Sequence, residues 1–121
     1  MVYLDQFLVP GILFLLTIGF GVWIARLGKP YHQILFNIHK LIALGGVVFA
    51  VLRIIELDPI NNFNSLTLGL MAAAILGVVA LFITGAMMSI SEDEPKGTRW
   101  IHRGGLILLL ISGSWAIYLI W

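Results

Sequence analysis

The sequence contains no cysteine and very little charge. Only 11% of its 121 residues are Asp, Glu, Lys or Arg, whereas soluble domains carry about 25%. Because so few charges cannot solvate a folded surface, the composition excludes a soluble single domain. The absence of cysteine excludes disulfides, thiolate zinc sites, cysteine-ligated iron–sulfur clusters and covalently attached c-type haem. A net charge of +1 is too small for a nucleic-acid-binding protein, which relies on many phosphate contacts.

Apolar residues dominate what is present. They make up 60% of the chain, and the mean hydropathy is +1.04. A membrane-spanning helix needs roughly 20 mostly apolar residues, and four stretches meet that length: residues 7–27, 40–57, 66–90 and 104–121. The connectors between them are short, so consecutive helices are expected to run antiparallel. The sequence therefore predicts an all-α, up-down-up-down four-helix bundle that forms one transmembrane domain over residues 1–121.

Lysine and arginine are distributed unevenly along this pattern. Six of the seven flank the first and third connectors: Arg26, Lys29, Lys40, Lys96, Arg99 and Arg103. Arg53 lies near the opposite ends of the spans. Because basic residues accumulate on the cytoplasmic side of a membrane, we expect a multi-pass protein of the cell membrane with both termini outside.

Small residues recur every four positions in three of the spans, a pattern that lets helices approach closely in lipid. Such residues predict where the helices touch. They are Thr17, Gly21 and Ala25, then Gly69, Ala73 and Gly77, then Ser112 and Ala116.

The two halves of the chain share a short motif. Ile38-His39-Lys40 opens the second expected span, and Ile101-His102-Arg103 opens the fourth. Gly21 precedes His39 by 18 positions, and Gly85 precedes His102 by 17. A parallel repeat of this kind predicts two imidazoles at the same depth, on the cytoplasmic side, on two helices that run the same way.

Paired imidazoles suggest a haem site. Imidazole is a strong ligand for haem iron, so His39 and His102 predict a six-coordinate, non-covalent b-type haem. Three glycines are expected to leave room for the flat porphyrin: Gly46, Gly85 and Gly105. Three cations are expected to pair with the haem propionates through charge-assisted contacts: Lys40, Arg99 and Arg103.

Other interpretations of these residues stay open. A histidine at a helix entrance beside lysine or arginine is also typical of an interfacial polar residue. His32 lies in the first connector and is expected to be solvated. Met87 and Met88 offer a thioether alternative for one axial position, although both fit simple apolar residues at the end of a span.

Histidines near the ends of alternate spans in a short bundle resemble the membrane b-type cytochromes of the cytochrome b-561-like group. The resemblance implies non-covalent haem b and single-electron transfer to or from a quinone or a redox partner, as an electron carrier rather than a stand-alone enzyme. In this sequence it implies His39 and His102 as ligands, with Arg99 and Arg103 beside the propionates. Many such cytochromes carry four ligand histidines for two haems, whereas this sequence offers two. The N-terminus expected outside also differs from their common arrangement.

A different class of function also fits the sequence. A chain with short connectors and glycine-rich spans is typical of an accessory subunit that packs against a larger membrane complex. Protein that lacks haem and co-purifies with larger subunits would favour this alternative.

Overall fold

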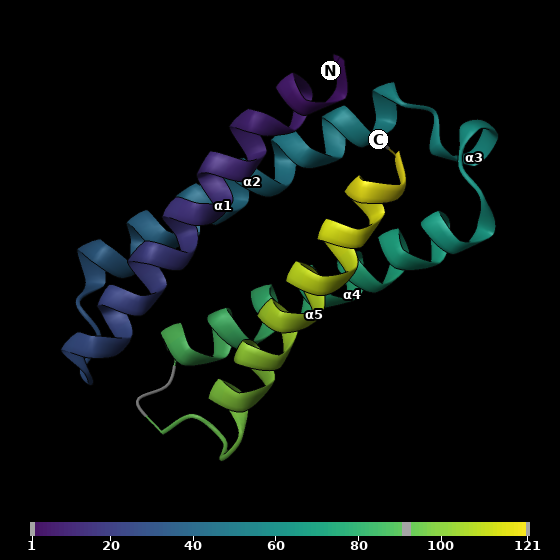
Figure 1. Cartoon of the computed structure of the whole chain (residues 1–121). Coiled ribbons are helices and arrows are strands. Elements are labelled where there is room, and N and C mark those ends of the chain that lie inside the picture. The colour runs from purple at the N-terminus through teal and green to yellow at the C-terminus, as the bar shows by residue number, and fades with distance from the viewer. Residues whose placement is uncertain (1, 91–92, 121) are drawn as a thin grey trace. The chain divides into compact units, whose positions relative to one another are not determined.

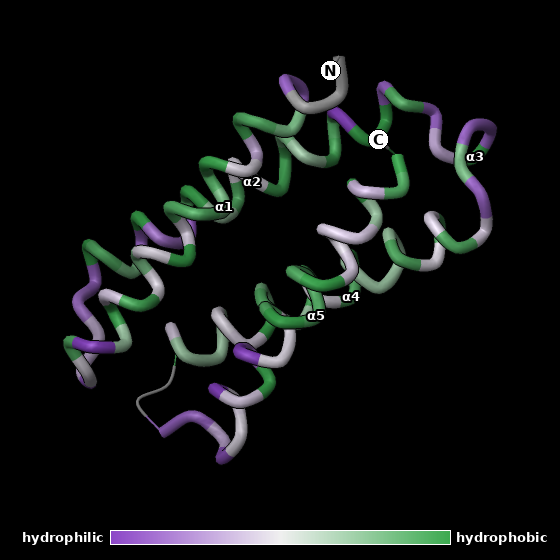
Figure 2. The backbone as a smooth tube through the Cα atoms, in the orientation of Figure 1, coloured by the Kyte–Doolittle hydropathy of each residue, from purple (hydrophilic) through white to green (hydrophobic). Residues whose placement is uncertain are grey.

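The computed structural model describes residues 2–90 and 93–120, with side chains from residue 5 onward. This part of the chain contains five helices (Figure 1): α1 (Val2–Leu27), α2 (Gln33–Glu56), α3 (Pro59–Asn62), α4 (Ser65–Ile90) and α5 (Thr98–Ile120). Four of them are long and apolar enough to cross a membrane: α1, α2, α4 and α5. Figure 2 shows that the bodies of these helices are hydrophobic and that the hydrophilic residues gather at their ends and in the connectors. The all-α class and the number of apolar helices are therefore confirmed.

The chain divides into two compact units, residues 1–58 and 59–121. In the first unit α1 packs against α2, and in the second α4 packs against α5. Both pairs are antiparallel. In the first, Leu13 lies opposite Gly46 and Gly21 lies opposite His39. In the second, Gly77 lies opposite Gly105 and Gly85 lies opposite His102. Each unit is therefore a helical hairpin.

Both hairpin connectors contain a glycine in the left-handed region. Gly28 follows the last residue of α1 with a φ of 75°, and Gly97 precedes α5 with a φ of 96°. Residues with a side chain rarely adopt this conformation. These two glycines allow the chain to reverse direction between the helices of each pair.

Three helices begin several residues before the apolar spans predicted from the sequence. Helix α2 starts at Gln33 rather than Lys40, and α5 starts at Thr98 rather than Gly104. Hydropathy reports where a chain can enter lipid and not where a helix begins. Polar residues near a helix start, such as Asn37, His39 and Lys40 in α2, lower the hydropathy without ending the helix. His39 and His102 consequently lie one to two turns inside their helices. Helix α1 likewise begins at Val2 rather than at residue 7, and it contains Pro10.

Side chains from the helix starts hold the ends of two helices. His32 is the N-cap of α2, and its Nδ1 accepts a hydrogen bond from the Leu35 backbone N–H at 3.4 Å. Asn64 precedes α4, and its Oδ1 accepts from the backbone N–H and the hydroxyl of Thr67 at 2.8 and 2.9 Å. Both arrangements satisfy N–H groups that lack a partner within the helix.

Candidate functional site

His39 is tied to the preceding helix by its ring. Its Nδ1 lies 2.9 Å from the backbone carbonyl oxygen of Thr17 on α1. A carbonyl oxygen only accepts hydrogen bonds, so Nδ1 carries the proton and donates it. In the neutral imidazole the lone pair is then on Nε2, the nitrogen that a metal ion would bind.

Gly21 provides the space for this ring. A Cβ at residue 21 would lie 3.1 Å from Cε1 and 3.5 Å from Nδ1 of His39. The Phe36 ring approaches the same imidazole edge-on, with 6.3 Å between the ring centroids. Three contacts within one hairpin thus hold His39: the hydrogen bond to Thr17, the packing of its ring against Gly21 and the contact with the Phe36 ring.

His102 occupies the equivalent place in the second hairpin. Its Nδ1 lies 2.8 Å from the hydroxyl oxygen of Thr84 on α4. That hydroxyl lies 2.6 Å from the carbonyl oxygen of Ala80 and donates its single proton there. The oxygen of Thr84 therefore accepts from Nδ1–H of His102, and this imidazole has the same tautomer as His39.

The spacing of glycine and histidine in the sequence corresponds to a contact between the two residues in both hairpins. A Cβ at Gly85 would lie 3.7 Å from Cε1 of His102, just as Gly21 faces Cε1 of His39. In each case the glycine of the first helix lies against the imidazole of the second. The contact at Gly85 is looser, since 3.7 Å is an ordinary van der Waals distance.

Two other glycines that the sequence placed near a porphyrin lie at contacts between helices. A Cβ at Gly46 would lie 3.4 Å from Cβ of Leu13, and one at Gly105 would lie 3.2 Å from the carbonyl oxygen of Gly77. The preceding helix of the same hairpin fills the space beside both residues. Their observed role is close helix packing, and a role beside a porphyrin stays a prediction.

The small-residue pattern gave helix contacts at some positions only. Gly77 meets α5 closely, and Ser112 and Ala116 are buried. Gly69, by contrast, meets no atom of another described element within 4 Å of its Cβ position. Position along the pattern alone does not tell which face of a helix is covered.

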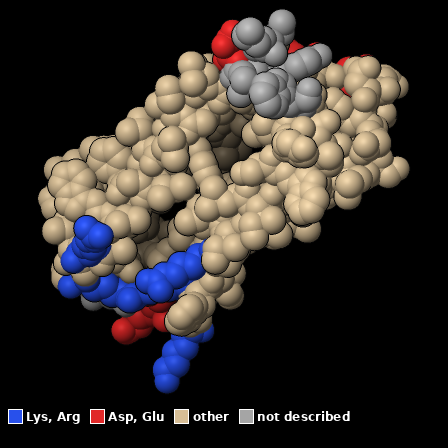
Figure 3. Space-filling view, in the orientation of Figure 1, with Lys and Arg blue, Asp and Glu red and all other residues tan. Residues whose placement is uncertain are grey.

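Within each hairpin the predicted propionate partners lie near the connector. Figure 3 shows Lys and Arg side chains against an otherwise largely uncharged surface. Lys40 Nζ lies 4.7 Å from the centroid of the Phe36 ring. The guanidinium of Arg103 lies 5.6 Å from the Trp100 ring, and Arg99 Nε lies 2.8 Å from Oε1 of Glu94. Pairing with propionates stays a prediction for all three cations.

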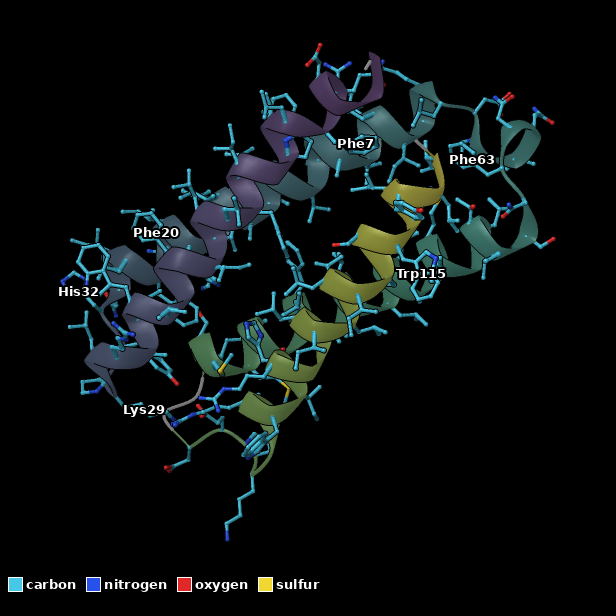
Figure 4. The ribbon with its side chains drawn as sticks, in the orientation of Figure 1. Phe7, Phe20, Lys29, His32, Phe63 and Trp115 are labelled. Atoms are coloured by element: carbon cyan, nitrogen blue, oxygen red, sulfur yellow. The ribbon has the colours of Figure 1, made fainter. Side chains whose placement is uncertain are left out.

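Three other residues of the sequence pattern are placed by the structure. His32 lies with Lys29 at the connector end of the first hairpin (Figure 4), where its exposed ring serves as a helix cap. Met87 is exposed and Met88 half-buried, both in the last turns of α4. Within the described part of the chain, no three His, Asp or Glu side chains form a metal-binding group.

Sequence reasoning missed the residues that hold the two histidines. The acceptor at His39 is the main chain of Thr17, and main-chain acceptors leave no mark in a sequence. The acceptor at His102 is the side chain of Thr84, next to Gly85. A hydroxyl residue one position from the glycine of the repeat is the signal that could have identified it.

Comparison with known proteins supplies no relative. The chain matches no known protein family, no characterised protein and no solved structure. Any functional assignment therefore rests on the chemistry and geometry of the two histidines.

Proposed function

We propose that this chain is a membrane b-type cytochrome in which His39 and His102 would hold the iron of one haem. The observation that carries the proposal is that each imidazole is held in the same way within its own hairpin. Each has Nδ1 held by the preceding helix, and each is seated on a glycine of that helix. A bound haem would supply a single-electron couple between ferric and ferrous iron.

The two histidines and their hydrogen-bond partners fit a bound haem. Histidines that ligate metals almost always donate their second ring N–H to a carbonyl, a carboxylate or water, which fixes the tautomer and raises the basicity of the ligating nitrogen. The Thr17 carbonyl supplies this contact for His39, and the Thr84 hydroxyl supplies its counterpart for His102. Because the chain has no cysteine, the attachment would be non-covalent.

The surroundings of the histidines support the same proposal. Each is followed directly by a cation, Lys40 or Arg103, which suits the carboxylates of haem propionates. The lack of a side chain at Gly46, Gly85 and Gly105 would leave room for the flat porphyrin. A quinone or a protein redox partner, including a larger membrane complex, would exchange electrons with the haem.

The proposed membrane arrangement follows from the basic residues. Four helices would cross the bilayer up-down-up-down, with the α1–α2 and α4–α5 connectors in the cytoplasm and both termini outside. His39 and His102 would then lie toward the cytoplasmic side. The four apolar helices and the basic connector ends support this orientation.

The alternative proposal is an accessory subunit without a cofactor. It is favoured by the fact that both histidine contacts also tie two helices together. Polar hydrogen bonds between membrane helices contribute about 1 kcal/mol each. In this case the imidazoles would serve helix packing alone.

Absorption spectroscopy of the full chain separates the two proposals. The protein is purified in mild detergent after expression with ample haem supply, and spectra are recorded before and after dithionite reduction. We expect one haem per chain, with a sharp reduced α band that is lost in His39→Ala and in His102→Ala. His32→Ala is the matched control and should keep the spectrum, because this histidine only caps α2.

The contrary results are equally specific. Colourless wild-type protein would overturn the cytochrome proposal and favour the accessory subunit. Retention of the wild-type spectrum by His39→Ala or His102→Ala would remove that residue from the ligand set. Where an alanine variant fails to fold, His39→Gly and His102→Gly with added imidazole test ligation by restoring the missing ligand from solution.

A further inference from the structure

We propose that Thr84 is a positioning residue that sets the ligand strength of His102 and makes the two ligand histidines chemically different. This inference rests on the proposed haem function. It concerns a side chain that touches neither iron nor porphyrin in the proposal and acts only through the imidazole. Thr84 is buried, with 4% of its surface exposed.

The hydroxyl of Thr84 forms the middle of a chain of hydrogen bonds. It donates to the Ala80 carbonyl oxygen at 2.6 Å, with the Leu81 carbonyl oxygen at 3.3 Å as a second neighbour. It accepts from Nδ1 of His102 at 2.8 Å. Hydrogen bonds in series polarise one another, so the bond to the carbonyl makes the hydroxyl oxygen a better acceptor for the imidazole N–H.

This chain of bonds changes the other ring nitrogen. Withdrawing the Nδ1 proton toward Thr84 increases the electron density on Nε2 and thus the basicity of the ligand. A more basic imidazole favours ferric over ferrous iron, because it donates more charge to the metal. Loss of the hydroxyl should therefore weaken haem binding and raise the reduction potential.

The first hairpin supplies an unusually close control. Thr17 also donates its hydroxyl to the carbonyl four residues earlier, with Oγ1 2.8 Å from the Leu13 oxygen. His39, however, bonds to the backbone carbonyl of Thr17 rather than to its hydroxyl. Thr17→Val and Thr84→Val thus remove the same local hydrogen bond, but only Thr84→Val removes a partner of a histidine.

The first test uses the haem-loaded full chain in detergent. We expect Thr84→Val to weaken haem affinity by about 10- to 100-fold, the usual effect of losing such a partner, and to move the midpoint potential to more positive values. Thr17→Val should match wild type in both measurements. Thr84→Ser keeps a hydroxyl and should restore most of the affinity and the potential.

A second test needs no haem. Nitrogen-15 NMR of the haem-free protein, at a pH where imidazole is neutral, reports which ring nitrogen carries the proton. We expect the Nδ1–H tautomer to dominate at His102 in wild type and Thr84→Ser, and to lose that dominance in Thr84→Val. The signal of His39 should be the same in all of these proteins.

The two tests distinguish failure of this inference from failure of the proposed function. Wild-type protein that binds no haem overturns the cytochrome proposal, and with it the role of Thr84 in tuning a ligand. Haem-loaded Thr84→Val with the affinity and potential of Thr17→Val overturns the inference while the cytochrome proposal stands. An unchanged His102 tautomer in Thr84→Val also overturns the inference, because the hydroxyl then does not fix the ring.

Discussion

The imidazole of His39 occupies the space that a side chain at Gly21 would fill. The Cβ of such a side chain would lie 3.1 Å from Cε1 of the ring, closer than most Cβ contacts in proteins. In the second hairpin the corresponding distance, from Gly85 to Cε1 of His102, is 3.7 Å. In both hairpins a glycine therefore accommodates the imidazole of the facing helix, and this contact is closer at Gly21 than at Gly85.

Alanine at each of these glycines should reveal the difference. Replacing a helical glycine with alanine favours the helix by up to about 1 kcal/mol, and Gly85→Ala should keep this gain. Gly21→Ala must push the His39 ring by a few tenths of an ångström and strain its bond to Thr17. We expect Gly21→Ala to be less stable than Gly85→Ala by about 1 kcal/mol, near the lower limit for overpacking.

Unfolding of both variants by SDS in mixed micelles measures this difference. Wild-type protein, unfolded under the same conditions, fixes the reference. Equal free energies of unfolding for Gly21→Ala and Gly85→Ala would show that the His39 ring moves aside without cost. This result would contradict a close contact between Gly21 and the His39 ring.

Gly77 marks the closest approach of α4 and α5. A Cβ at this residue would lie 2.9 Å from the carbonyl oxygen of Gly105, and backbone cannot swing away as a flexible side chain can. Gly77→Ala should separate the two helices and lower the free energy of unfolding by about 1–3 kcal/mol, as other overpacked sites do. Thermal unfolding in detergent provides the measurement.

Gly69 is the matched control for Gly77 on the same helix. Among the described residues, no other element comes within 4 Å of its Cβ position. Gly69→Ala should therefore leave the stability of the hairpin unchanged or slightly higher. Equal melting temperatures for the two variants would contradict the close packing of α4 and α5 at Gly77.

The four long helices could be predicted because each is an apolar run of membrane-spanning length. Their starts could not, because polar residues near a helix start lower the hydropathy without ending the helix. Asn37, His39 and Lys40 lie within α2, which begins at Gln33, and α5 begins at Thr98. The short helix α3 was missed for a related reason. Pro59 is a strong breaker inside a helix but is well suited to the first helical position, where no N–H partner is needed.

The two histidines of the candidate site could be proposed from the sequence, but their contacts with the facing helices could not. The repeat around His39 and His102 identified the two imidazoles, and the spacing to Gly21 and Gly85 reflects a real contact in each hairpin. What the glycines accommodate in the structure is the imidazole itself. The sequence could not show this, because which face a glycine presents depends on the rotation of each helix against its neighbour.

The side chain of Asn64 should stabilise the start of α4. It accepts two hydrogen bonds from Thr67, one from the backbone N–H and one from the hydroxyl. Asn64→Ala leaves both donors without this acceptor and should cost about 1 kcal/mol, the typical value for a lost N-cap. Asn64→Ser keeps a capping oxygen, so its unfolding in detergent should stay close to wild type; equal losses in both variants would contradict the cap.

The predicted orientation can be tested directly because the natural chain has no cysteine to interfere. Gln33→Cys, Asn61→Cys and Asp93→Cys place one thiol near each of the three connectors, at exposed residues and without removing a basic side chain. In intact cells a membrane-impermeant maleimide should label only Asn61→Cys. The other two variants should react only after the membrane is opened, since basic connectors remain in the cytoplasm.

The unmodified chain is the background control for this labelling, and total reactivity after solubilisation shows that each thiol is accessible. Labelling of Gln33→Cys and Asp93→Cys in intact cells, with Asn61→Cys protected, would reverse the orientation and place both histidines toward the outside. Protection of only one of the two basic connectors would contradict the up-down-up-down arrangement itself. An odd number of crossings would then separate the α1–α2 connector from the α4–α5 connector, and His39 and His102 would lie toward opposite faces of the membrane. One haem with both histidines as ligands requires the two connectors to be on the same side, so this labelling pattern would also remove the geometric basis of the cytochrome proposal.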